Sequence, residues 1–206
     1  NLPYLGLSYS DDKILQDIKT KNLKYIKYDN DQLLASKIAE YIKSDKIIAF
    51  VRGRSEFGPR ALCHRSILAN PNMKDILNNR VKHREEFRPF APTVSFEDQF
   101  KYFDLKVPSE YMLFATTVKK EFRSDLCAIT HVDNTARIQA ISKEKDPFLH
   151  LLLKEMEKIT GYPILLNTSF NVAGQPIVES PLDALNTFLC TDIDLLILEN
   201  YIIFKS

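Results

Sequence analysis

The sequence has 206 residues, of which 45% are hydrophobic and 27% charged, with a formal net charge of +1 and a pI of about 7.8. This composition is that of an ordinary globular domain, and it excludes a disordered or membrane-spanning chain. A general nucleic-acid-binding domain is expected to be basic overall, with a pI above about 9. The near-neutral charge balance therefore argues against polymer binding.

The ends of the chain and its rarer residues exclude further classes. No apolar run approaches the roughly 18 residues that a transmembrane helix needs, and no secretory leader pattern begins the chain, so we expect a cytoplasmic protein. The chain starts at Asn1 rather than Met, and we expect it to be part of a longer protein. Its three cysteines and four histidines show neither CxxC nor HExxH spacing, so no metal site is expected.

Helical and strand patterns alternate along the chain, which predicts an α/β or mixed α+β fold with one continuous sheet flanked by helices. Pro147 is expected to begin a strong helix, and Gly161 to end it. Helices are predicted over residues 11–19, 29–46, 73–82, 147–161 and 180–192, and strands over 24–29, 46–51, 111–118, 136–141, 163–167, 194–198 and 201–205.

Positive charge is concentrated in one stretch. Residues 52–88 carry a net charge of +5, whereas the rest of the chain carries −4. A guanidinium group offers a planar fork of donors that suits phosphate or carboxylate, so this stretch predicts a site for a small anion such as a nucleotide or an acyl phosphate. Alternatively, the arginines cap helices and pair with Glu56, Glu85 and Glu86. Seven of the nine arginines lie here: Arg52, Arg54, Arg60, Arg65, Arg80, Arg84 and Arg88.

The segment GRSEFGPR, residues 53–60, follows a predicted strand and has two glycines at the spacing of a phosphate-binding loop. Such a loop needs Lys and then Ser or Thr after its second glycine, and Pro59 and Arg60 stand there instead. These two residues therefore argue against a P-loop nucleotidase. Arg54 and Arg60 stay candidate anion ligands, and Glu56 is a candidate structural partner for them.

The segment VKHREEFRPFAP, residues 81–92, is the second candidate. In an extended conformation Lys82, Arg84 and Arg88 share a face, and three cations on one wall suit a triphosphate or pyrophosphate. The alternative is a solvated charged edge with no ligand.

Two later segments add polar residues next to strands. THVDNTARIQA places Arg137 at the start of a predicted strand, and PILLNTSFN runs from a buried strand into polar residues. The carboxyl end of a strand is where α/β proteins commonly bind ligands, although turn formation explains any one of these residues equally well. The polar residues after that strand are Asn167, Thr168, Ser169 and Asn171.

From about Lys46 onward the sequence resembles a known family. The segments GRSEFGPRAL, HRSILANP, VKHREEFRPFAP, THVDNTARIQ, PILLNTSFN, GQPIVESPLDAL and DLLILENY, in this order, look like the carboxyl-terminal domain of the nodulation-type (NodU-type) O-carbamoyltransferases. The resemblance implies a YrdC-like fold, a twisted open α/β sheet flanked by helices with a concave basic face. It divides the chain into residues 1–22, a junction remnant from a missing amino-terminal domain, and residues 23–206, the YrdC-like domain.

The resemblance also implies a reaction. Carbamoyl phosphate is converted to a carbamoyl unit that attacks the α-phosphate of ATP, which gives carbamoyl-adenylate and pyrophosphate. Mg²⁺ enters with ATP, and no protein-ligated metal is implied. The missing amino-terminal domain then passes the carbamoyl group to a substrate hydroxyl. Two alternatives stay open, a non-catalytic nucleotide- or RNA-binding module and an interaction domain that shapes its partner. The sequence also leaves open whether the chain forms a homodimer.

The resemblance assigns roles to individual residues. Lys82, Arg88 and Arg137 match catalytic residues of the family, and Ser169 with Asn171 matches an SxN element that binds substrate. This sequence departs from the family at Cys63 and His64, where the resemblance predicts Gly-Asn or Gly-His. Supporting contacts to the substrate or nucleotide are expected from Arg54, Arg60, Arg84 and Asn167.

Overall fold

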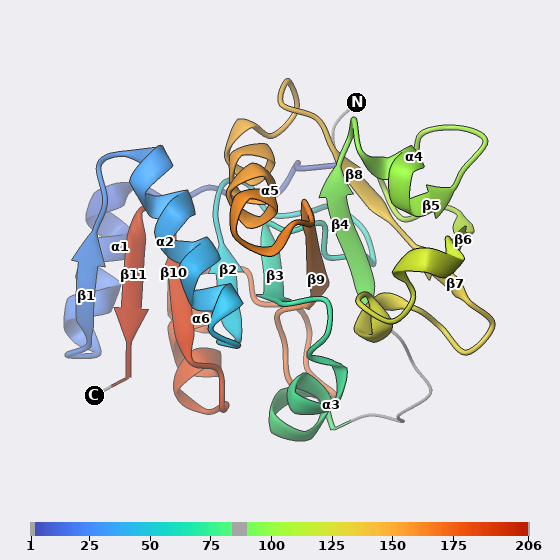
Figure 1. Ribbon diagram of the computed structural model, residues 1–206. Helices are drawn as coiled ribbons and strands as arrows, with labels where there is room; N and C mark the ends of the chain where they lie inside the picture. Colours follow the sequence, from blue (N-terminus) through green and yellow to red (C-terminus); the bar gives the residue numbers. More distant parts are fainter. Residues whose placement is uncertain (1–2, 84–89, 206) are drawn as a thin grey trace.

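The computed structural model describes residues 3–83 and 90–205, and its main feature is a large twisted sheet with helices on both faces (Figure 1). Within these residues the sheet has eight strands in the order β1-β11-β10-β2-β3-β9-β4-β8. β3, β4 and β8 run opposite to β2 and β9. The strands are β1 (Lys24–Lys27), β2 (Ile48–Val51), β3 (Arg65–Ala69), β4 (Ala91–Ser95), β8 (Gln139–Ile141), β9 (Ile164–Ser169), β10 (Leu195–Leu198) and β11 (Tyr201–Phe204).

Helices cover both faces because the central strands are apolar on both faces. In β2, Ile48 and Phe50 pack with the residues of α2 and α5, whereas Ala49 and Val51 pack with those of α1 and α6. α2 and α5 lie side by side on the near face in Figure 1, and α1 lies behind the sheet. The helices are α1 (Asp11–Thr20), α2 (Asp31–Lys43), α3 (Lys74–Leu77), α4 (Gln99–Tyr102), α5 (Pro147–Thr160) and α6 (Pro181–Leu189).

The helix ends follow the signals in the sequence. The Asn30 side chain accepts a hydrogen bond from the Leu33 amide at the start of α2, and Ser180 with Asp183 forms a capping box at α6. Gly161 ends α5 with a φ of 84°, a conformation that glycine adopts without strain. The mixed α/β class and these predicted helices are confirmed.

The prediction of one continuous sheet is wrong. A second, three-stranded sheet is formed by β5 (Phe103–Asp104), β6 (Ala115–Val118) and β7 (Thr135–Arg137), at the end of the molecule far from β1 (Figure 1). The predicted strand 136–141 breaks at Ile138, because β7 pairs with β6 in the small sheet and β8 pairs with β4 in the large one. Arg137 therefore ends a strand rather than starting one.

Two central strands were not expected from the sequence. β3 lies between β2 and β9 and is buried along its whole length, yet it starts with Arg65, and β4 contains Pro92. Charge and proline both argue against a central strand, and here the tertiary structure overrides them.

Residues 3–22 pack against the rest of the chain. Ile14 and Ile18 of α1 lie in the core, and the Tyr4 ring stacks on His64 with ring centroids 3.7 Å apart. None of the helices in the described part of the chain is long and apolar enough to cross a membrane.

Candidate functional site

A cavity of about 160 Å³ lies where β9 ends, and we call it the β9 cavity. Because β3 and β4 run antiparallel to β9, the segments that lead into these two strands meet its carboxyl end. The lining residues therefore come from distant parts of the sequence: Pro59, Arg60, Ala61, Phe90, Ala91, Met112, Arg137, Asn167, Thr168 and Ser169.

The polar end of β9 forms one wall of this cavity. Ile164, Leu165 and Leu166 are fully buried, and the strand then changes to polar residues. Asn167 and Ser169 project from the same face of the strand because side chains alternate along it. The sequence predicted a ligand site at this strand end, and the structure does place a cavity there.

Two arginines give the cavity its charge. Arg60 is exposed and makes no hydrogen bond or ion pair with another described residue, and Arg137 reaches the cavity from the end of β7. No Asp or Glu is among the described residues that line it. Guanidinium groups only donate hydrogen bonds, so the cavity can bind an anion.

Lys82, in the segment that follows α3, contacts the same end of β9. Its Nζ donates to the carbonyl oxygens of Ser169 (2.6 Å) and Asn171 (3.1 Å) and to Asn171 Oδ1 (3.0 Å), while Ser169 Oγ donates to Asn171 Oδ1 (2.7 Å). The structure thus brings Lys82 together with the SxN pair. The extended conformation expected for Lys82 is wrong, because it ends a π-helical turn (Asn78–Lys82) after α3. Arg84 and Arg88 lie outside the described residues.

The other arginines of the basic stretch bind elsewhere. Arg54 donates to the carbonyl oxygens of Gly6 (2.9 Å) and Leu5 (2.8 Å) and does not line the β9 cavity. Arg80 pairs with Asp194, 3.2 Å away. Glu56 is not a partner of Arg54 or Arg60 as expected: its Oε1 accepts hydrogen bonds from the backbone amides of Leu62, His64 and Arg65.

A buried polar cluster lies under the cavity, and sequence reasoning missed it. Asn167 Nδ2 donates to Gln139 Oε1 (3.2 Å), Cys63 Sγ (3.2 Å) and Thr93 Oγ1 (3.4 Å). Cys63 has a φ of 74°, a left-handed conformation that costs a residue other than glycine about 1–2 kcal/mol. The glycine expected from the family resemblance at this point was the signal for this backbone turn.

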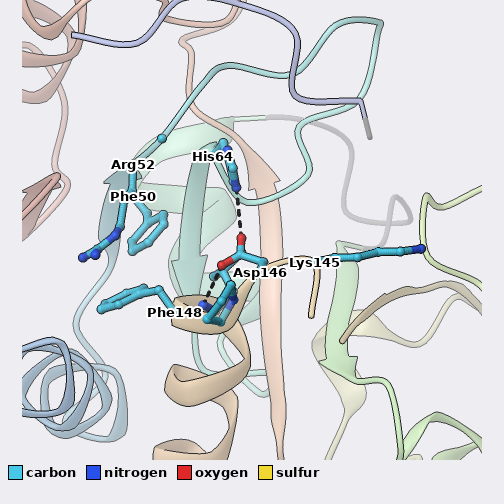
Figure 2. A pocket seen from close by; sticks show the side chains of 9 residues that line it. Phe50, Arg52, His64, Lys145, Asp146 and Phe148 are labelled. Carbon is cyan, nitrogen blue, oxygen red and sulfur yellow. Dashed lines mark hydrogen bonds and ion pairs between the residues drawn. The ribbon is translucent and has the colours of Figure 1, made fainter. Parts of the chain in front are cut away.

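A second cavity, of about 170 Å³, lies at the start of α5, and we call it the α5 pocket. Figure 2 shows His64 and Asp146 pointing toward each other, with Arg52 beside Phe50 and Phe148. His64 Nε2 lies 2.9 Å from Asp146 Oδ2, and its Nδ1 lies 2.7 Å from the Arg54 carbonyl oxygen. Asp146 also caps α5 by accepting a hydrogen bond from the Leu149 amide (2.9 Å).

The described residues hold no group of three or more His, Cys, Asp or Glu side chains that could bind a metal ion. The β9 cavity instead offers two arginines, an amide and two hydroxyls, and the α5 pocket offers His64 and Asp146 beside Arg52 and Lys145. The model of the carbamoyltransferase C-terminus family matches residues 39–205.

This chain belongs to that family. It is 39% identical to the uncharacterized protein sll1178 of Synechocystis, over 98% of this chain and 37% of that protein. It is 47% identical to the nodulation protein NolNO of Sinorhizobium fredii, over 84% of this chain and 26% of that protein. The chain thus spans well under half the length of these curated relatives.

Two solved structures share the fold. HypF, in a phosphate- and nucleotide-bound form, matches 85% of this chain and 22% of its own length, with a TM-score of 0.57 and 20% identity. Sua5 of P. abyssi matches 82% of this chain and 49% of its own length, with a TM-score of 0.52 and 14% identity. Both fit the YrdC-like fold that the sequence resemblance implied.

Proposed function

We propose that this chain is the carbamoyl-adenylate-forming part of an O-carbamoyltransferase and binds carbamoyl phosphate and ATP at the β9 cavity. The observation that carries the proposal is the meeting of Arg60, Arg137 and Ser169 in one cavity of a carbamoyltransferase-family chain. The phosphate and nucleotide named for the HypF structure support an anion site in this fold.

The chemistry needs charge screening more than a covalent nucleophile. Water cleaves carbamoyl phosphate to carbamate and phosphate, a carbamate oxygen then attacks the α-phosphorus of ATP, and the bond to the β-phosphate breaks to release pyrophosphate. Both partners in the second step are anions, so fixed cations must screen their repulsion. Arg60 and Arg137 supply this charge, and Lys82 holds Ser169 and Asn171 in place. Mg²⁺ would bind through the triphosphate.

The size of the cavity fits one part of this substrate set. Its volume of about 160 Å³ is below the roughly 300–1,000 Å³ of pockets that enclose drug-sized ligands. It suits the carbamoyl and phosphate end of the reaction, with the rest of the nucleotide outside it.

The acceptor step belongs to another domain in this proposal. The curated relatives are longer than this chain, and the matching family model describes a carboxyl terminus. We place the junction to an amino-terminal transferase domain in residues 1–22. That domain would carry the carbamoyl group to a hydroxyl substrate.

The test is product formation by the full-length parent protein. With ATP, Mg²⁺ and carbamoyl phosphate we expect pyrophosphate, and also AMP, which is released when water or the hydroxyl acceptor takes the carbamoyl group from carbamoyl-adenylate. Arg60→Ala or Arg137→Ala should slow their formation roughly tenfold to a hundredfold, because a hydrogen bond to a charged group contributes about 1.5–3 kcal/mol. Arg123→Ala, which removes an arginine outside the cavity, is the matched control.

The outcome also separates the proposal from its alternative. If the full-length protein binds ATP but forms no AMP, the enzyme assignment fails and a nucleotide-binding module remains. Binding of an RNA polymer through several phosphates would then fall steeply with salt, whereas binding of ATP at a compact site would fall less.

A further inference from the structure

Asn167 is a buried residue of the β9 cavity with an unused hydrogen-bond acceptor. The residue is 1% exposed, and its Oδ1 has no hydrogen-bond partner among the described residues. Buried side-chain oxygens are paired in the large majority of cases, so an unpaired one beside a cavity points to a ligand that supplies the donor.

The orientation of the Asn167 amide is fixed by its neighbours. Gln139 donates through Nε2 to the Leu62 carbonyl oxygen (3.0 Å), which can only accept, so Gln139 Oε1 faces Asn167. Asn167 must therefore present Nδ2 to Gln139, and Nδ2 also donates to the Ala61 carbonyl oxygen (3.3 Å). Rotating the amide by half a turn would set Oδ1 against two acceptors.

The rest of the cluster is uncharged. Burial raises the pKa of the Cys63 thiol well above its usual range, so the thiol stays neutral near physiological pH. Cys63 Sγ and Thr93 Oγ1 lie 3.1 Å apart, and both accept a hydrogen bond from Asn167 Nδ2. The cluster therefore holds Asn167 Nδ2 away from the ligand. Because the cluster carries no charge, it does not attract an ion itself.

A ligand of this cavity needs two features. The guanidinium group of Arg60 favours an anionic group, and Asn167 Oδ1 requires an N–H or O–H donor close to it. A carbamoyl group next to a phosphate has both, because its NH₂ can donate while its oxygens face the arginines. An acetyl group has the same shape with a methyl group in place of the NH₂.

We propose that Asn167 Oδ1 accepts a hydrogen bond from the carbamoyl NH₂ and selects carbamoyl over acyl substrates. This inference rests on the proposed function, since it assumes that carbamoyl phosphate binds in the β9 cavity. A site built to pair a polar group rejects the analogue that lacks it, because its own buried group is then left unpaired.

Two stable phosphonates isolate this single contact. Phosphonoacetamide ends in an amide NH₂, and 2-oxopropylphosphonate ends in a methyl ketone of the same shape and charge. Calorimetric titration of both into the full-length wild-type protein should show a preference of roughly tenfold for the amide. Asn167→Leu should abolish the preference while it retains binding of the ketone, and Asn186→Leu, at an exposed position of α6, is the matched control.

The outcomes of this titration and of the AMP assay separate the role of Asn167 from the proposed function. Equal binding of the two probes by the wild-type protein overturns the inference, even if Asn167→Leu does not fold. A preference that survives in Asn167→Leu overturns it as well. If neither probe binds, the assignment of the cavity to carbamoyl phosphate fails together with it. A protein that prefers the amide but forms no AMP keeps this inference and contradicts the adenylate chemistry.

Discussion

The α5 pocket and the β9 cavity each contain one arginine from the loop between β2 and β3, but these two side chains have different partners. Arg52, at the start of this loop, donates to Asp31 (2.8 Å), and its guanidinium group lies 3.8 Å from the Phe148 ring centroid in the α5 pocket (Figure 2). Arg60, near the end of the loop, has no such partner among the described residues and lines the β9 cavity. The two arginines thus come from one loop but have different surroundings.

This difference favours the β9 cavity as the site of the chemistry. In the α5 pocket His64 contacts Asp146, and Arg52 pairs with Asp31 outside the pocket, although Arg52 Nη1 is buried without a hydrogen-bond partner among the described residues. In the β9 cavity the exposed Arg60 and the buried Asn167 Oδ1 have no hydrogen-bond partner among the described residues. We therefore expect α5-pocket substitutions to change stability and β9-cavity substitutions to change turnover.

The largest effect is expected at Arg65, the first residue of β3. It is 1% exposed and donates to the carbonyl oxygens of Glu179 (3.1 Å), Gly53 (3.0 Å) and His64 (2.9 Å). Arg65→Met would remove these three buried hydrogen bonds, and we expect the free energy of unfolding to fall by roughly 3–5 kcal/mol. Urea denaturation measures this loss.

Arg123→Met serves as its control, because Arg123 is partly exposed and donates to one carbonyl oxygen. A loss at Arg65 within about 0.5 kcal/mol, as at ordinary surface positions, would show that Arg65 does not hold the loop.

Asp146→Ala is expected to have the next largest effect. It removes the cap of α5 and the contact with His64, and loss of an N-cap costs about 0.5–2 kcal/mol. Asp146→Asn keeps a capping oxygen, so a double-mutant cycle of Asp146→Asn with His64→Gln isolates the His64 contact. AMP formation per folded molecule should not change. If it falls while stability is kept, the α5 pocket has a chemical role and the comparison is wrong.

Much of the fold could be predicted from the sequence, because its helices carry strong local signals. Pro147 and Gly161 mark the two ends of α5 by the backbone angles that they favour, and both act as the sequence indicated. The division into two sheets could not be predicted. It depends on strand pairs between segments far apart in the sequence, such as β4 with β8 and β6 with β7.

Part of the candidate site could also be predicted, because some of its residues belong to local sequence patterns. The polar end of β9 is a local pattern, so Asn167 and Ser169 could be found from the sequence, and the family motifs added Arg137. The cluster of Cys63, Thr93 and Gln139 under the cavity joins three segments through side-chain contacts. Nothing local marks Thr93 or Gln139 as polar groups of a shared site.

The smallest expected effect on stability is that of Arg52→Ala. The variant loses an ion pair to the exposed Asp31 and the contact with the Phe148 ring, which together contribute about 1 kcal/mol. Its AMP formation should stay at the wild-type level, whereas Arg60→Ala should unfold like the wild type and lose at least roughly tenfold in AMP formation. Thermal denaturation and the AMP assay, run on both variants, measure the two quantities. If Arg52→Ala slows AMP formation as much as Arg60→Ala does, Arg52 takes part in the reaction despite its contacts with Asp31 and Phe148. Both cavities then belong to one site.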